Sequence, residues 1–203
     1  LEKALIAEDS QVMVEALQTL GIPAEVEGDR FVVEGCGGHV PVKEAELDLR
    51  LSGTSIRFLT ALVALGEGTF RLDGNRRMRE RPIQDLLDAL AGLGVKSETQ
   101  FQTGAPPVIL TATGIKGGKT RIAGDRSSQY LSALLMVSPL ADAPVTIEVT
   151  GELQSKPFID MTLGLMGDFG VLVEHEGYDC FYVHPSCYQA RCYTIEGDAM
   201  SAG

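Results

Sequence analysis

Three stretches of the chain share one pattern of apolar and polar residues, and each stretch closes on a glycine. The apolar residues at helical spacing are Met13, Leu17 and Leu20; Ile83, Leu86, Leu87 and Leu90; and Ile159, Leu163 and Met166. Gly21, Gly94 and Gly170 follow at intervals of 73 and 76 residues, and glycine suits the left-handed conformation that ends many helices. Alternating residues come next, most clearly in 25–34 and 171–183. The pattern therefore predicts three helices, each followed by a hairpin.

The second and third stretches are also alike in what precedes them. Residues 52–65 and 127–137 have the apolar spacing of a helix. The strands expected after these helices are 69–72 and 145–149. Pro82 and Pro157 then stand where we expect the first turn of the next helix, a position that tolerates proline. Each full unit thus reads as helix, strand, helix and hairpin, with a further strand leading in.

The first unit is predicted to be incomplete. Only a strand, residues 1–7, is expected before its second helix, so its first helix is missing. Near the other end, Glu196-Gly197-Asp198-Ala199 has the pattern of a helix cap shortly before Gly203. Both ends are expected to be cut from a larger protein. The repeats predict one α/β domain over residues 1–203, with pseudo-threefold symmetry, helices packed inside and sheets outside.

Charge narrows the classes of function. The net charge is −11, which disfavours nucleic acid and anionic membranes as partners, and no apolar run approaches the roughly 18 residues of a membrane span. Seven of the eleven arginines nevertheless lie between Arg50 and Arg81. Such local concentration in an acidic chain indicates a site for a small, multiply charged anion.

Serines and arginines supply the candidate ligands for that anion. Gly53-Thr54-Ser55 and Ser127-Ser128-Gln129 open equivalent predicted helices, and Ser155-Lys156-Pro157-Phe158 opens another. Their hydroxyls can either cap a helix or bind an oxyanion at its positive end, and the pattern leaves both readings open. The arginines of 76–81 are too close in sequence to share one face, so some must pair with acids such as Glu80. At least one is free to grip a phosphate or carboxylate, but spacing alone does not say which.

The cysteines suggest neither a disulfide scaffold nor a metal site. The four cysteines are Cys36, Cys180, Cys187 and Cys192. Reduced thiols in a cytoplasmic protein are the simpler interpretation. His184 lies among the last three, and Cys180, Tyr182 and His184 are expected on one face of a strand. The paired C-x-x-C spacing of structural zinc sites is absent, so no metal is expected.

Taken together, these motifs resemble the 5-enolpyruvylshikimate-3-phosphate synthase family of enolpyruvyl transferases. The matching segments are Ser52-Gly53-Thr54-Ser55-Ile56-Arg57, residues 77–83, residues 127–135, residues 155–162 and Glu196-Gly197-Asp198-Ala199, in family order over nearly the whole chain. The resemblance implies two similar domains of three βαβαββ units each, an inside-out barrel with the active site in the cleft between the domains. This chain is similar to the N-terminal domain, running from one interdomain crossover to the other.

The resemblance also implies roles for individual residues. Gly53 and Arg77 would bind phosphoenolpyruvate, supported by Thr54 and Arg57. The residues implied for shikimate 3-phosphate are Ser127, Ser128, Ser155 and Phe158, with Gln129 touching both substrates and Asp198 near the reaction at the crossover. The family reaction needs no metal or cofactor. This chain departs from the family at three positions: it has Leu51 for Asn, Phe58 for Pro and Phe158 for Tyr.

The resemblance places the acid–base groups of the reaction in the complementary C-terminal domain. Because such groups must lie within hydrogen-bond reach of the reacting atoms, the isolated chain is expected to be inactive and at best a weak binder. Two alternatives remain. One is a domain of the sister enzyme that uses UDP-N-acetylglucosamine, which Ser127-Ser128-Gln129 disfavours, and the other is a non-catalytic ligand-binding domain.

Overall fold

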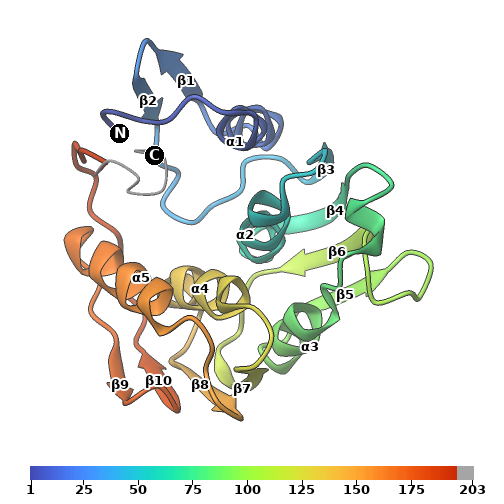
Figure 1. The fold of residues 1–203 in the computed structure, drawn as a ribbon, viewed down its shortest axis with the longest axis vertical. Coiled ribbons are helices and arrows are strands. Elements are labelled where there is room, and N and C mark those ends of the chain that lie inside the picture. Colours follow the sequence, from blue (N-terminus) through green and yellow to red (C-terminus); the bar gives the residue numbers. More distant parts are fainter. Residues whose placement is uncertain (196–203) are drawn as a thin grey trace.

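The computed structural model describes residues 1–195 and places two four-stranded sheets around a set of packed helices (Figure 1). The helices are α1 (Glu8–Thr19), α2 (Gly53–Val63), α3 (Gln84–Gly92), α4 (Ser128–Val137) and α5 (Lys156–Asp168), with short 3-10 turns η1 (Met78–Glu80) and η2 (Ser138–Leu140). The strands are β1 (Ala24–Glu27), β2 (Arg30–Val33), β3 (Glu44–Asp48), β4 (Glu67–Asp73), β5 (Lys96–Thr99), β6 (Val108–Thr113), β7 (Gly118–Ala123), β8 (Val145–Thr150), β9 (Glu174–Glu176) and β10 (Cys180–Val183). None of the helices in this part of the chain has the length and apolar character needed to cross a bilayer.

The two large sheets have the same topology, which confirms the predicted repeat. Their strand orders are β3-β4-β6-β5 and β7-β8-β10-β9. In each sheet the first two strands are parallel and the other neighbours are antiparallel. Along the chain, a helix joins the first strand to the second (α2 between β3 and β4, α4 between β7 and β8). Another helix leads from the second strand to the hairpin (α3 before β5 and β6, α5 before β9 and β10). Both units are therefore complete βαβαββ motifs.

The first unit is assembled from the two ends of the described chain. Its hairpin, β1 and β2, pairs as predicted. Beside the hairpin, the amide of Phe31 donates to the carbonyl of Leu1 at 2.9 Å, and Glu2 forms a parallel bridge with Thr194. The order from Thr194 through Glu2 to β2 and β1 repeats the order of the larger sheets. The predicted strand over residues 1–7 is wrong beyond this bridge, because Lys3 has a φ of 55°, which a continuous strand cannot contain.

Helices α2 and α4 lie inside and the sheets lie outside them, as expected, whereas α5 lies at the edge of the molecule with only Ile159 and Met166 buried (Figure 1). Helices α2 and α4 are the central pair, and most of their residues are buried. Helix α3 packs against β5 and β7, where it joins the two large sheets. An apolar hollow of about 350 Å³ remains between α1, α2, α4 and α5, lined by Met13, Phe58, Leu62, Met136 and Leu165 among others. Phe58, one of the departures from the family pattern, thus faces apolar neighbours.

The predicted helix ends are confirmed, and one predicted start is wrong. Gly21, Gly94 and Gly170 have φ values of 78°, 87° and 86° and follow the last turns of α1, α3 and α5. Pro157 lies in the first turn of α5 as expected. Pro82, however, precedes α3, which begins at Gln84. The chain is still extended just before Pro82, and Ile83 takes the cap position with its amide donating to a loop carbonyl.

Candidate functional site

The starts of α2 and α4 are capped by serines, although not all of the predicted hydroxyls act as caps. At α2 the cap is Ser52, whose Oγ accepts a hydrogen bond from the amide of Ser55 at 3.4 Å and donates to its hydroxyl at 2.7 Å. At α4 the cap is Ser127, whose Oγ accepts from the amide of Gln129 at 3.3 Å. Ser128, the first residue of α4, is buried. Thr54 is exposed and its hydroxyl takes no part in capping.

Gln129 ties the two helix starts together. Its side-chain amide donates to Thr54 Oγ1 at 3.2 Å, and its carbonyl oxygen accepts a hydrogen bond from Arg57 Nη1. These contacts bring residues more than 70 positions apart into one cluster. Because the first amides of a helix lack partners within the helix, two neighbouring helix starts create a region with a partial positive charge.

Tyr130 joins this cluster to the arginine-rich segment. The guanidinium carbon of Arg57 lies 5.2 Å from the centre of the Tyr130 ring, within range of a cation–π interaction. The Tyr130 hydroxyl donates to the carbonyl of Pro82 at 2.5 Å. Burial raises the pKa of the Tyr130 phenol, so it stays protonated as a donor. The residues just after the arginines are thereby held at the start of α4.

Ion pairing sorts the seven arginines, which sequence spacing could not do. The pairs are Arg50 with Glu15 (2.6 Å), Arg71 and Arg79 with Asp73 (2.9 and 2.7 Å), and Arg76 with Glu80 (3.8 Å). Within residues 1–195, the remaining three arginines form no ion pair with a carboxylate: Arg57, Arg77 and Arg81. Their positive charge is therefore available to an anion.

Two of these unpaired arginines meet over the first residue of α2. A Cβ atom at Gly53 would collide with Nη1 of Arg81 and would lie 3.6 Å from Nη1 of Arg57. Glycine is thus the residue that leaves room for a guanidinium at this helix start. Arg77 is exposed and belongs to the same loop as Arg81, but within residues 1–195 its side chain forms no hydrogen bond with Gln129 or Thr54, which bond elsewhere. Arg81 was not among the predicted ligands, since nothing in the local pattern distinguishes it from its neighbours.

The start of α5 carries the last predicted hydroxyl. Ser155 is the cap residue with a left-handed φ of 56°, and its side chain makes no capping bond, so the hydroxyl is available to a ligand. Phe158 is 58% exposed. Helix α5 runs beside α4, where Ser132 and Thr162 share a hydrogen bond of 2.8 Å. In the described part of the chain, the hydrogen bonds that join Thr54, Arg57 and Gln129 do not include Ser155.

Some predictions fall elsewhere. Asp198 lies outside the described residues. All four cysteines are free, with Cys180 half-buried on β10, and His184 follows the end of that strand. Within residues 1–195 no group of three or more histidine, cysteine, aspartate or glutamate side chains has the geometry to hold a metal ion.

Comparison with known proteins agrees with the repeat and the motifs. The chain matches the family profile of EPSP synthase (3-phosphoshikimate 1-carboxyvinyltransferase) over residues 1–203. It is 44% identical to the 3-phosphoshikimate 1-carboxyvinyltransferase of Trichormus variabilis and 45% identical to that of Shewanella denitrificans. In both comparisons all of this chain is covered but only 48% of the relative. The chain thus spans about half the length of these relatives.

Solved structures show the same fold. An EPSP synthase from Acinetobacter baumannii superposes with a TM-score of 0.74 and 22% sequence identity, over 89% of this chain and 40% of that one. The two complete βαβαββ units, the motifs at their helix starts and the whole-length match lead to one assignment. This chain belongs to the EPSP synthase (3-phosphoshikimate 1-carboxyvinyltransferase) family.

Proposed function

We propose that this chain is the substrate-binding N-terminal half of an enolpyruvyl transferase, cut at the two crossovers to a complementary C-terminal domain. The full enzyme would transfer the enolpyruvyl group of phosphoenolpyruvate to the 5-hydroxyl of shikimate 3-phosphate and release phosphate. The observation that carries the proposal is the meeting of unpaired Arg57 and Arg81 over Gly53, beside the start of α4. Both substrates are multiply charged anions, which guanidinium groups and helix starts bind well.

In this proposal the two anions divide the site. Phosphoenolpyruvate would lie over Gly53, held by Arg77 and Arg57, with Thr54 fixing the loop. The contacts of Gln129 with both Thr54 and Arg57 support a place for its amide between the two substrates. The shikimate 3-phosphate ligands would be Ser127, Ser128 and Ser155, with Phe158 against the ring. The Ser155 hydroxyl makes no capping bond, which supports its role as a ligand. Asp198 would act near the substrates from the crossover.

The chemistry itself would need the other domain. The 5-hydroxyl adds to C2 of phosphoenolpyruvate while C3 gains a proton, and the tetrahedral product then eliminates phosphate. Both steps require proton donors and acceptors near the reacting atoms, and the residues proposed above bind and orient charge. The chain alone is thus expected to bind its ligands weakly and not to turn over. The full enzyme would act in the cytoplasm, in keeping with its free cysteines.

Reconstitution tests the catalytic proposal. The chain is mixed with the complementary domain, association is verified by sedimentation, and phosphate release from the two substrates is followed. We expect release from the mixture and none from either half. Arg77→Ala should abolish it, whereas Arg121→Ala, which removes an exposed partner of Glu148 on an outer strand, should not. Association without any release would count against the catalytic role.

Titration of the chain alone tests the site residues. Addition of shikimate 3-phosphate, followed by ¹⁵N NMR, should shift the amides of 127–129 and 155. Shifts confined to the outer sheets would show that the residue assignments are wrong. Binding without activity in the reconstituted pair would instead favour a non-catalytic ligand-binding domain.

A further inference from the structure

Asp73 is the one buried charged residue among residues 1–195, and only 7% of its surface is exposed. It ends β4, directly before the loop that carries the arginines. A buried carboxylate is costly unless it is paired and hydrogen-bonded. Its partners therefore show what the fold uses this charge for.

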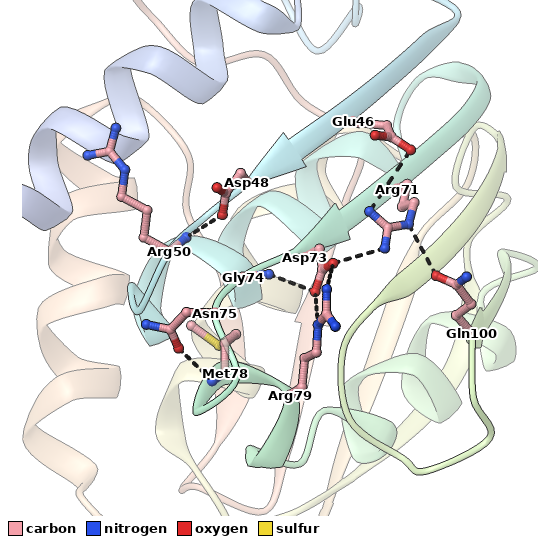
Figure 2. Close-up of polar contacts among 10 residues, drawn as sticks. All are labelled: Glu46, Asp48, Arg50, Arg71, Asp73, Gly74, Asn75, Met78, Arg79 and Gln100. Atoms are coloured by element: carbon pink, nitrogen blue, oxygen red, sulfur yellow. Dashed lines mark hydrogen bonds and ion pairs between the residues drawn. The ribbon is translucent and has the colours of Figure 1, made fainter.

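Four donors surround the Asp73 carboxylate, and Figure 2 shows them converging on it. Arg79 binds both oxygens, with Nε at 2.9 Å from Oδ1 and Nη2 at 2.7 Å from Oδ2. Arg71 places Nη2 at 2.9 Å from Oδ2, and the amide of Gly74 donates to Oδ1 at 2.8 Å. Because the contact is bidentate, it fixes the orientation of the Arg79 guanidinium as well as its distance from the carboxylate.

The loop between these contacts is held by hydrogen bonds of Asn75. The amide of Asn75 donates to the carbonyl of Arg50 at 2.8 Å, and Asn75 Oδ1 accepts from the amide of Met78 at 3.1 Å. Met78 is fully buried. A side chain at Gly74 would collide with the Arg50 carbonyl and with Met78, so the loop can pack this closely only with glycine there.

These contacts leave a short segment whose arginines alternate between two environments. Arg79 turns inward to Asp73, while Arg77 and Arg81, each two residues away, stay free of carboxylates within residues 1–195. Arg81 reaches Gly53. Arg79 lies within the turn η1, and Arg77 and Arg81 are the cap residues on either side of it.

We propose that Asp73 is a positioning residue for the anion site: it draws Arg79 and Arg71 away and thereby sets the loop so that Arg77 and Arg81 face the ligand. The inference deepens the proposed function and rests on it only for the identity of the ligand. Loss of the Asp73 charge would release the Arg79 side chain and remove the contact that holds η1 in place. The site would then keep all its arginines but hold them in varied orientations.

The main variant is Asp73→Asn, which keeps the shape of the side chain and removes its charge. Arg79→Gln releases the same clamp from the other partner and serves if the first variant does not fold. The control is Asp142→Asn, which breaks an exposed pair of 3.0 Å with Lys116 far from the loop. Thermal unfolding establishes that each variant is folded.

The first measurement reports on the loop without any ligand. Amide hydrogen exchange should speed up at Met78 and Arg81 by about tenfold or more in Asp73→Asn, because opening of the loop is no longer opposed by the clamp. Asp142→Asn should leave these amides unchanged. Wild-type protection at both amides in a folded Asp73→Asn variant would overturn the proposal.

The second measurement is binding of phosphoenolpyruvate to the chain. We expect Asp73→Asn to weaken this binding about tenfold. Because Asp73 also sets Arg81, the double variant with Arg77→Ala should lose less affinity than the two single losses combined, and it should differ from Arg77→Ala alone only to the extent that Arg81 contributes. This non-additivity is what distinguishes positioning from a general loss of stability. Independent, additive effects would refute it. A wild-type chain that binds no phosphoenolpyruvate would defeat the proposed function, while the exchange data would still decide the role of Asp73.

Discussion

Replacement of Tyr130 by phenylalanine gives a sharp test of how the arginine segment is joined to α4. Tyr130 is 2% exposed, and its hydroxyl donates a hydrogen bond to the Pro82 carbonyl. Tyr130→Phe keeps the ring under Arg57 but removes the donor and leaves a partly buried carbonyl without its partner. We expect a loss of about 1.5 kcal/mol of unfolding free energy, which corresponds to a fall in Tm of about 3–6 °C for a chain of this size.

The assay is thermal unfolding at pH 7, with Tyr182→Phe as the matched control. Tyr182 also has a bonded hydroxyl, 2.9 Å from Glu176, but the contact is exposed, so its Tm should not change. Burial raises the pKa of Tyr130 above its ordinary value of 10.0. Its contribution is therefore complete below pH 10 and is lost as the pH rises through the folded pKa, and the variant should lack this alkaline loss. An unchanged Tm in Tyr130→Phe would refute the reasoning.

Three further predictions follow from the same contacts. Burial alone would raise the pKa of the Asp73 carboxyl, but Arg79, the Gly74 amide and Arg71 outweigh it and hold the pKa below 3.8; its stabilisation is thus present above that pH and lost as pH falls through the folded pKa. Asp73→Asn should cost about 2 kcal/mol of unfolding free energy at pH 7. It should also flatten the fall in stability, measured by urea unfolding, as the pH drops below 3.8, and an unaltered fall would contradict this. Arg57→Ala should weaken phosphoenolpyruvate binding about tenfold, as measured by titration calorimetry. It should also lower the free energy of unfolding by about 1 kcal/mol, because the contact with Tyr130 is lost. An affinity equal to that of the wild type would show that Arg57 is not part of the site. Ser155→Gly should stabilise the chain by about 1 kcal/mol, because glycine adopts the left-handed φ without strain, yet it should weaken shikimate 3-phosphate binding. Ser127→Ala, which loses a helix cap, should instead lower stability by about 1 kcal/mol. Lower stability in Ser155→Gly would show that its hydroxyl supports the fold.

Local patterns predicted most of the fold because the elements are short and clearly bounded. Apolar spacing and the glycines at 21, 94 and 170 located the second helix of each unit. The parallel bridge of Glu2 with Thr194 could not be foreseen, since its partners are 192 residues apart and no local signal links them. The left-handed conformation of Lys3 also has no signal in the sequence, and this conformation limits the predicted first strand to one bridge.

The sequence indicated the residue types of the candidate site but not how their side chains pair. Helix starts and clustered arginines predict an anion site. Which of the arginines lack a carboxylate partner, however, depends on acidic residues that the sheets bring close to them. Asp73 forms ion pairs with Arg71 and Arg79, but its only signal in the sequence is a carboxylate just before Gly74 at the end of a strand. Arg81 could be recognised only once the fold placed it over Gly53.

The joint between the two ends of the described chain has a mechanical consequence. Glu2 pairs in parallel with the segment around Thr194 through two backbone hydrogen bonds, to Tyr193 and from Ile195. A force that draws the two ends apart acts along these strands and stretches both bonds at once, in shear, instead of opening them one after the other. Tension entering at either end can thus pass straight across the domain without first unravelling its hairpins.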